Sequence, residues 1–160
     1  MRKRKQSDRS VIDLSRAHLL VRALPDRAPA SVQTIPRSLR LFREGSLEAF
    51  YAPADHENHA ARVAIVGLTP GWQQARIAYE RFAEARRAGL SIRRAVEEAK
   101  RHASFAGPMR SNLVAMLDAL GLHRRLGLRS CMDLFDDGRS LLHTTSALRY
   151  PVFVDGRNYS

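Results

Sequence analysis

The fold is decided by the stretch RVAIVGLTPG at residues 62–71. Its first half is a short run of β-branched and apolar residues, which is the pattern of a buried parallel strand. Its second half holds two glycines and a proline within five residues, which predicts a turn. Apolar residues then recur at helical spacing, so we expect a helix over residues 73–87. A strand, a turn and a helix in this order predict an α/β fold.

Two further helices and a second strand are predicted downstream. Ser91 is a suitable N-cap for a helix over residues 92–103, and leucines at helical spacing predict another over 113–120. Residues 140–145 then form a second apolar run, which predicts a second buried strand.

In a βαβ unit, ligands bind beyond the carboxyl ends of the parallel strands. The segments that follow the two predicted strands are residues 69–74 and 144–150. We therefore expect these two segments to lie side by side at one rim of the sheet.

The flanking segments carry weaker patterns. We expect a disordered basic tail over 1–10, a short helix over 11–21, a loop over 25–36, a second short helix over 37–51, and a loop over 149–160 with a turn at Asp155-Gly156.

The composition points to an anionic partner. The chain has 160 residues, the length of one domain, and 27 Lys and Arg against 16 Asp and Glu, for a net charge of +11. Nearly all of the positive charge is arginine, which forks onto phosphate and stacks on bases. Nucleic acid is the leading partner class and an anionic membrane surface the second. An arginine-rich proteome would produce the same excess without any function.

Other classes are excluded by what the sequence lacks. The single cysteine, Cys131, rules out a disulfide framework and any multi-cysteine zinc or iron–sulfur site, and it is expected to be a small core residue. His56 and His59 lack the spacing of a tight metal pair. No apolar run approaches the ~18 residues of a membrane span. We expect a cytoplasmic protein with no membrane association, no metal site and no cofactor.

Four segments in order resemble the uracil-DNA glycosylase superfamily. Gly67-Leu68-Thr69-Pro70-Gly71 is similar to the family's first motif, a turn after strand one. Ser104-Phe105-Ala106-Gly107 and the leucine-rich helix 111–122 are similar to its Phe-x-Gly segment and next helix. Residues 141–146 are similar to the strand whose end reads the base. The resemblance covers residues 61–160, and residues 1–60 would be a basic tail and extension.

The resemblance implies a three-layer α/β/α sandwich on a short parallel sheet, incomplete at its C-terminus. It also implies base excision from DNA, in which a flipped nucleotide loses its base by hydrolysis of the N-glycosidic bond. By motif position, Phe105 would stack on the base and Thr69 would orient the water. Thr144, Thr145 and Ser146 would meet the base edge, and Arg110 and Arg149 would hold phosphate.

The sequence departs from the family pattern at the catalytic positions. Thr69 stands where several branches have Asp or Asn, and a hydroxyl is no general base near neutral pH. The family's late His- or Asn-led motif is absent from these residues. A non-catalytic nucleic-acid-binding module on the same fold is therefore the alternative, and a small nucleotide- or phosphate-binding protein is a third reading. Trp72 could stack on a base or fill the core, and His143 is expected to be a hydrogen-bonded core residue.

Overall fold

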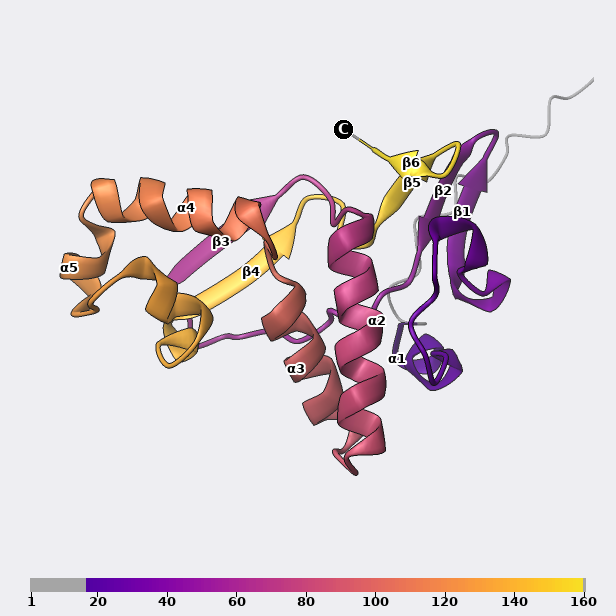
Figure 1. Ribbon diagram of the computed structural model, residues 1–160, viewed down its shortest axis with the longest axis horizontal. Coiled ribbons are helices and arrows are strands. Elements are labelled where there is room, and N and C mark those ends of the chain that lie inside the picture. Colours follow the sequence, from indigo (N-terminus) through magenta and orange to yellow (C-terminus); the bar gives the residue numbers. More distant parts are fainter. Residues whose placement is uncertain (1–16, 160) are drawn as a thin grey trace, which may run out of the picture.

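The computed structural model describes residues 17–159 and shows an elongated molecule (Figure 1). The predicted tail over residues 1–10 lies outside the described residues, as does most of the helix predicted over 11–21. The elements are α1 (Ala17–Leu20), β1 (Arg40–Glu44), β2 (Leu47–Phe50), β3 (Val63–Gly67), α2 (Trp72–Arg87), α3 (Ile92–Ala103), α4 (Pro108–Ala119), α5 (Leu122–Leu126), β4 (Leu142–Ser146), β5 (Val152–Val154) and β6 (Arg157–Asn158). Short 3-10 helices, among them Cys131–Phe135, join them.

The predicted parallel pair is confirmed. β3 and β4 lie side by side, with Val63 opposite Leu142 and Gly67 opposite Ser146. The prediction that β3 is a buried strand is wrong, because its residues alternate and Val66 is 62% exposed. A two-stranded sheet with helices over one face buries every second residue only. Mixed helices and strands with this parallel pair make the chain an α/β protein.

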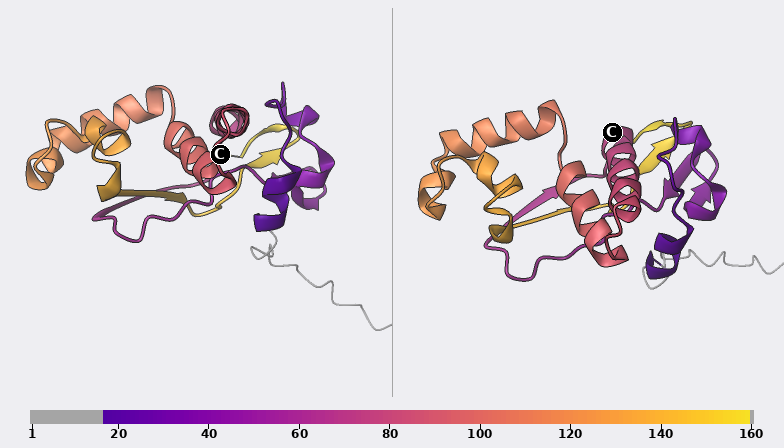
Figure 2. Two further views of the ribbon diagram at one scale, coloured as in Figure 1. Left: turned by 90° about the horizontal axis from the view of Figure 1, so that it is seen from below. Right: turned by 60° about the horizontal axis from the view of Figure 1, so that its bottom comes forward.

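One apolar core lies between this sheet and the helices at one end of the molecule. It joins the inward side chains of the β3–β4 sheet to α4 and the 131–135 helix, and Leu134 and Cys131 are fully buried in it. Cys131 is thus a core residue, as expected. Figure 2 shows α4 above the sheet, while the opposite face is followed by the loop that leads from β2 to β3.

A second sheet was not predicted. It is antiparallel in the order β1-β2-β5-β6, and it joins residues near both ends of the described chain. The helix predicted over 37–51 is wrong, because β1 and β2 form a hairpin there. The loop predicted over 149–160 is wrong except for its turn at Asp155 and Gly156, where both residues have positive φ. Local apolar spacing in these short runs is ambiguous, and the pairing of β2 with β5 decides between helix and strand.

The larger core packs α2 and α3 against this second sheet and the segment before it. Alanines lie on the buried faces of both helices, and Ala75, Ala95 and Ala99 are almost wholly buried. Small side chains let the helix axes approach closely, and Tyr79 and Phe82 then fill the space toward the sheet. The predicted loop over 25–36 is mostly irregular, although it contains a 3-10 turn over Val32–Thr34.

The three predicted helices are confirmed. α2 and α3 match the expected ranges, and the Oγ of Ser91 accepts a hydrogen bond of 3.4 Å from the backbone N–H of Arg94, as an N-cap does. α4 is followed by Gly121, whose φ of 74° suits the left-handed end of a helix. Trp72 packs against the larger core, so of its two readings the structure shows core packing.

Candidate functional site

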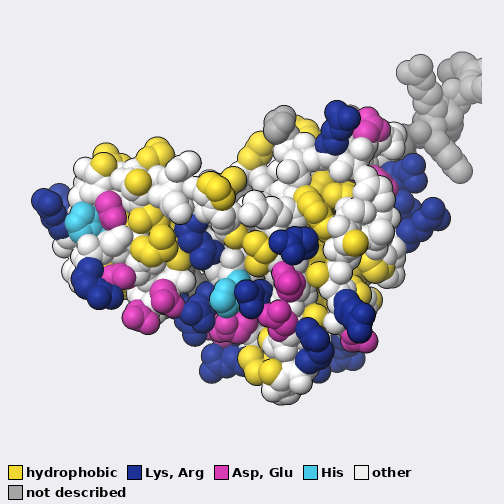
Figure 3. Space-filling model, in the orientation of Figure 1, with side chains coloured by type: hydrophobic (Ala, Val, Ile, Leu, Met, Phe, Trp, Pro, Cys, Tyr) yellow, Lys and Arg dark blue, Asp and Glu magenta, His cyan; other side chains and the backbone are white. Residues whose placement is uncertain are grey.

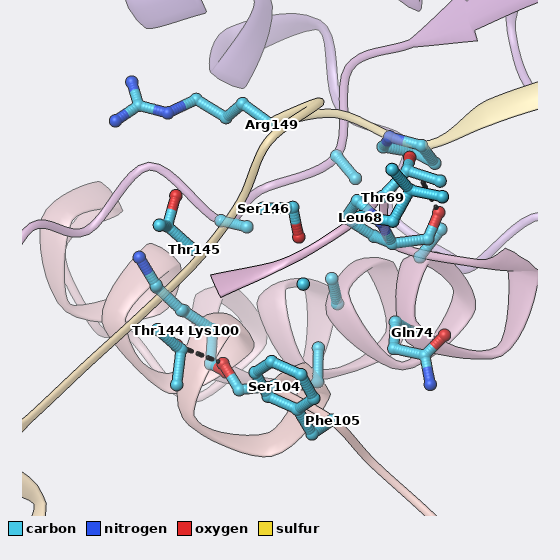
Figure 4. Close-up of a pocket in the computed structure, with 18 of the residues that line it drawn as sticks. Leu68, Thr69, Gln74, Lys100, Ser104, Phe105, Thr144, Thr145, Ser146 and Arg149 are labelled. Atoms are coloured by element: carbon cyan, nitrogen blue, oxygen red, sulfur yellow. Dashed lines mark hydrogen bonds between the residues drawn. The ribbon is translucent and has the colours of Figure 1, made fainter. Parts of the chain in front are cut away.

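A cavity of about 220 Å³ lies where β3 and β4 end (Figure 4). The two predicted rim segments meet there, because Ala147 and Leu148 donate backbone hydrogen bonds to the carbonyls of Gly67 and Leu68. Pockets for drug-sized ligands have roughly 300–1,000 Å³, so this one suits a single ring system. The polar side chains of the lining are Thr69, Gln74, Lys100, Ser104, Thr144, Thr145, Ser146 and Arg149, and its apolar part includes Leu68, Pro70, Phe105 and Met109.

Phe105 forms an aromatic wall of the cavity. The ring lies against the end of β3, where a Cβ added to Gly67 would be 3.5 Å from it, an ordinary van der Waals contact. Phe105 has a φ of 53°, a left-handed conformation that costs a non-glycine residue about 1 kcal/mol. Gly107 fixes the same turn, since its φ is 83° and a Cβ there would lie 2.7 Å from Nε2 of Gln73. Phe105 also packs against the smaller core, so it is both a wall and a core residue.

The end of β4 supplies hydroxyl groups. Thr144 is buried, and its Oγ1 lies 2.8 Å from the Oγ of Ser104, with which it shares a hydrogen bond. Thr145 and Ser146 follow it along the same rim, and Ser146 lies opposite Gly67. The three residues that were expected to meet a base therefore line one cavity with Phe105.

Thr69 lies in the cavity wall, but its hydroxyl is engaged. The Oγ1 of Thr69 donates to the carbonyl oxygen of Tyr150 at 3.0 Å, which ties the turn after β3 to the segment after β4. Gln74 secures the same turn, because its Oε1 accepts from the backbone N–H of Gly71 at 3.1 Å. Thr69 therefore holds the rim together, and Pro70 and Gly71 complete this motif turn.

Two cations border the cavity. Arg149 lies at its mouth and forms an ion pair of 2.5 Å with Glu57, which raises the pKa of the guanidinium and lowers that of the carboxyl. Lys100 lies deeper, and its Nζ donates to the carbonyl oxygen of His56 at 2.5 Å. Burial, aided by the nearby charge of Arg149, lowers the pKa of Lys100 to about 8.

Arg110, the other predicted phosphate ligand, is not part of this cavity. Its guanidinium donates to the backbone carbonyls of Arg101, His102 and Ser104 at 2.6–3.1 Å. It also lies 4.7 Å from the ring centroid of Phe135. These contacts occupy the donors at the carboxyl end of α3, so Arg110 ties α3 to α4.

A polar cavity of about 270 Å³ adjoins the first across Lys100, Ser104 and Thr144. His143 lines it and accepts a hydrogen bond of 3.3 Å from the backbone N–H of Asn58, as expected of a hydrogen-bonded histidine. Burial lowers the pKa of both His56 and His143. Both imidazoles are therefore biased toward their neutral form.

Lys100 and Ser104 line the cavity but are not among the site residues that the sequence predicts. Lys100 lies four residues after Val96 and next to Ala99, at the edge of the buried face of α3. That helical spacing is the signal that would have found it. Ser104 follows α3 directly, and its partner Thr144 is forty residues away, so no local pattern links them.

The lining limits what the cavity can do chemically. Among residues 17–159, those that line it include no Asp, Glu, His or Cys. The lining therefore supplies an aromatic face, hydroxyl groups and two cations, but no side chain that acts as a general base through a carboxylate or imidazole.

The positive charge is spread over several elements. On the face shown in Figure 3, Lys and Arg side chains are scattered and interleaved with Asp and Glu. Several arginines on α2 and α3 pair with glutamates one turn away, as Arg76 does with Glu80 and Arg94 with Glu97. Within the described range, no helix has both the length and the apolar character to cross a membrane.

Comparison with known proteins points to an uncharacterized relative. No family model matches the chain, and no solved structure matches it. The chain is 40% identical over 122 residues to the uncharacterized protein YoxB of Bacillus subtilis (strain 168). The match takes in 76% of this chain and 48% of YoxB. The chain therefore spans about half the length of the curated relative to which it is similar.

Proposed function

We propose that this chain is a DNA-binding module that holds one flipped base in the cavity at the ends of β3 and β4. The observation that carries the proposal is the lining itself, where the ring of Phe105 faces a small cavity with Thr145, Ser146 and Arg149 at its rim. An unstacked base needs an aromatic face, hydrogen-bond partners for its edge, and a cation for its phosphate. This arrangement supplies all three.

The residues that line the cavity favour base binding over base excision. Thr69 gives its proton to a backbone carbonyl, and the described lining has no carboxylate or imidazole. A water held there would have no carboxylate or imidazole to take its proton, and Lys100 is mostly protonated at neutral pH.

Base excision is the second candidate. It is favoured by the order of the motifs along the chain and by their positions side by side at one rim of the sheet. The resemblance to uracil-DNA glycosylases implies this arrangement. It would require a group that activates water, either the neutral amine of Lys100 or a residue outside the described lining. The three-layer sandwich that the resemblance implies belongs to this proposal, and would need helices over the face of β3–β4 that carries Val66.

The test compares binding of two labelled oligonucleotides, one with an unpaired base and one with an abasic site at the same position. We expect Phe105→Leu to weaken binding of the first about tenfold, since stacking contributes roughly 1–3 kcal/mol per base, and to leave the second unchanged. Phe135→Leu is the matched control, because Phe135 is buried in the same core outside the cavity. Equal loss with both oligonucleotides would show that Phe105 is only a core residue.

Two further measurements on the same protein distinguish base binding from base excision and from nucleotide binding. Release of uracil or hypoxanthine from an oligonucleotide, seen as alkali-sensitive strand breaks, would establish excision and overturn a purely binding function. Thermal stabilisation by free nucleotides without affinity for DNA would select a nucleotide-binding protein instead.

A further inference from the structure

A second group of functional side chains lies far from the cavity, at the α5 end of the molecule (Figure 1). Asp118 is near the end of α4, His123 is in α5, and Cys131 begins the next 3-10 helix. One carboxylate oxygen, one imidazole nitrogen and the thiol sulfur lie within 4.8 Å of one another. Three short segments therefore converge through three different donor atoms.

The carboxylate of Asp118 is held in a fixed orientation. Its Oδ1 accepts from the backbone N–H of Cys131 at 2.7 Å, and its Oδ2 accepts from the Oγ of Ser130 at 2.7 Å. These bonds lower the pKa of Asp118 to about 2, so the group is an anion. Hydrogen bonds from neighbouring groups orient carboxylate ligands in this way in metal sites.

The Nδ1 atom of His123 is the unexplained group. It is buried and makes no hydrogen bond within the described chain, although it lies 3.2 Å from Oδ1 of Asp118. A buried nitrogen without a hydrogen bond destabilises the fold. A cation placed among the three donor atoms would give this nitrogen a partner.

Cys131 completes the set with a sulfur atom. Its side chain is fully buried. Burial and the neighbouring Asp118 raise the pKa of its thiol to about 11, so it is not an exposed, reactive thiolate. Cys131 would enclose a bound ligand on the side of the core. Asp118 and His123 are partly exposed to solvent on the other side.

We propose that Asp118, His123 and Cys131 bind one divalent transition-metal ion of the Zn²⁺ type. Sulfur, imidazole nitrogen and carboxylate oxygen together suit Zn²⁺ or Co²⁺, whereas Mg²⁺ and Ca²⁺ take oxygen ligands. As the metal–sulfur bond forms, the thiol proton passes to solvent, and water takes the fourth position. A single cysteine is sufficient for such a mixed site. The ion would cross-link α4, α5 and the 131–135 helix.

The test is a Co²⁺ titration of the full, chelator-treated chain. We expect one Co²⁺ per chain, with a near-ultraviolet sulfur-to-cobalt charge-transfer band and visible bands of tetrahedral Co²⁺, both abolished by one equivalent of Zn²⁺. Cys131→Ser should remove the charge-transfer band, and His123→Ala should weaken binding at least tenfold. His102→Ala is the matched control and should bind as the parent does, because His102 lies on α3 away from this cluster.

Two results would overturn the proposal. One is the absence of a sulfur-to-cobalt band in the folded parent chain, which would make the cluster an ordinary hydrogen-bonded turn. The other is Co²⁺ binding that survives unchanged in both variants. Circular dichroism would show whether Cys131→Ser folds. If it does not fold, His123→Ala provides the test. Excess Zn²⁺ should then raise the melting temperature of the parent chain but not that of His123→Ala.

Discussion

Lys100 shows how the surroundings of one side chain change its chemistry. Its stem is buried beside β4, and its ammonium group donates to a single backbone carbonyl, that of His56. The loss of hydration lowers its pKa to about 8, so the group loses its charge just above neutral pH. Arg149, at the same cavity, stays charged throughout that range. The attraction of the cavity for an anion should therefore depend on pH through Lys100.

We expect oligonucleotide binding to weaken about tenfold between pH 7 and pH 9, the equivalent of one charge-assisted hydrogen bond. Anisotropy titrations across this range would measure it. Lys100→Met should bind more weakly at pH 7 and show a flat profile. A parent profile as flat as that of the variant would mean that Lys100 does not face the bound anion.

Stability gives an independent readout of the same residue. The folded-state pKa of about 8 lies below the ordinary 10.5, so the unfolded chain binds more protons between these values. Stability should therefore rise with pH between about 8 and 10.5 in the parent, relative to Lys100→Met. Urea denaturation of both proteins at several pH values would measure the difference. A constant difference over this range would contradict a lowered pKa.

At the scale of elements, local signals predicted the helices and the parallel pair. The apolar spacing of α2, the Ser91 cap of α3 and the turn at Gly67–Gly71 act within a few residues, so they can be read from the sequence. The strands β1, β2, β5 and β6 depend on partners distant along the chain, and their short runs fit either a helix or a strand. The sequence predicted the two segments at the rim of the cavity. It did not predict Lys100 or Ser104 as lining residues, because tertiary packing brings them there.

Variants of Arg110 and Arg149 should distinguish a structural role from a role in DNA binding. Arg110→Met should lower the free energy of unfolding by about 2–3 kcal/mol, because the carbonyls at the end of α3 lose a charged donor. It should leave the salt dependence of DNA binding unchanged. Arg149→Met should reduce the slope of log affinity against log salt by about 1 and change stability little, since exposed ion pairs contribute roughly 0–1 kcal/mol.

Urea denaturation and anisotropy titrations at several salt concentrations would measure both effects. If Arg110→Met changed the salt slope and Arg149→Met did not, the assignments of the two arginines would be reversed.

At the scale of the whole molecule, two cores share one chain. The larger joins the segment before residue 60 to the last strands. There Phe153 is fully buried, and its ring centroid lies 6.2 Å from that of Phe50, with the two rings tilted by 51°. The smaller lies under α4, and Phe105 packs against it directly after α3. Because α3 belongs to one core and Phe105 to the other, we expect the two to unfold together.

Phe153→Ala should lower the free energy of unfolding by about 3–5 kcal/mol, as the loss of a buried phenylalanine does. Trp72 fluorescence would follow the larger core, and labelling of the buried Cys131 thiol would follow the smaller one. We expect both transitions to shift equally. Leu120→Ala is the control, because Leu120 is 81% exposed and its loss should change stability by less than about 0.5 kcal/mol. A shift in the Trp72 transition alone would show that the cores unfold separately.

The pairing of β2 with β5 has a consequence for how the chain acquires its structure during synthesis. Leu47 lies opposite Val154, so this ladder joins residues on the order of a hundred positions apart. The ribosome releases β2 long before it synthesises β5. During that time the hairpin of β1 and β2 is exposed along the edge of β2 that later pairs with β5. The helices α2, α3 and α4 can form during this interval, whereas β4 is made only shortly before β5. The two sheets are therefore the last parts to close, and a chaperone that shields strand edges would act on this interval.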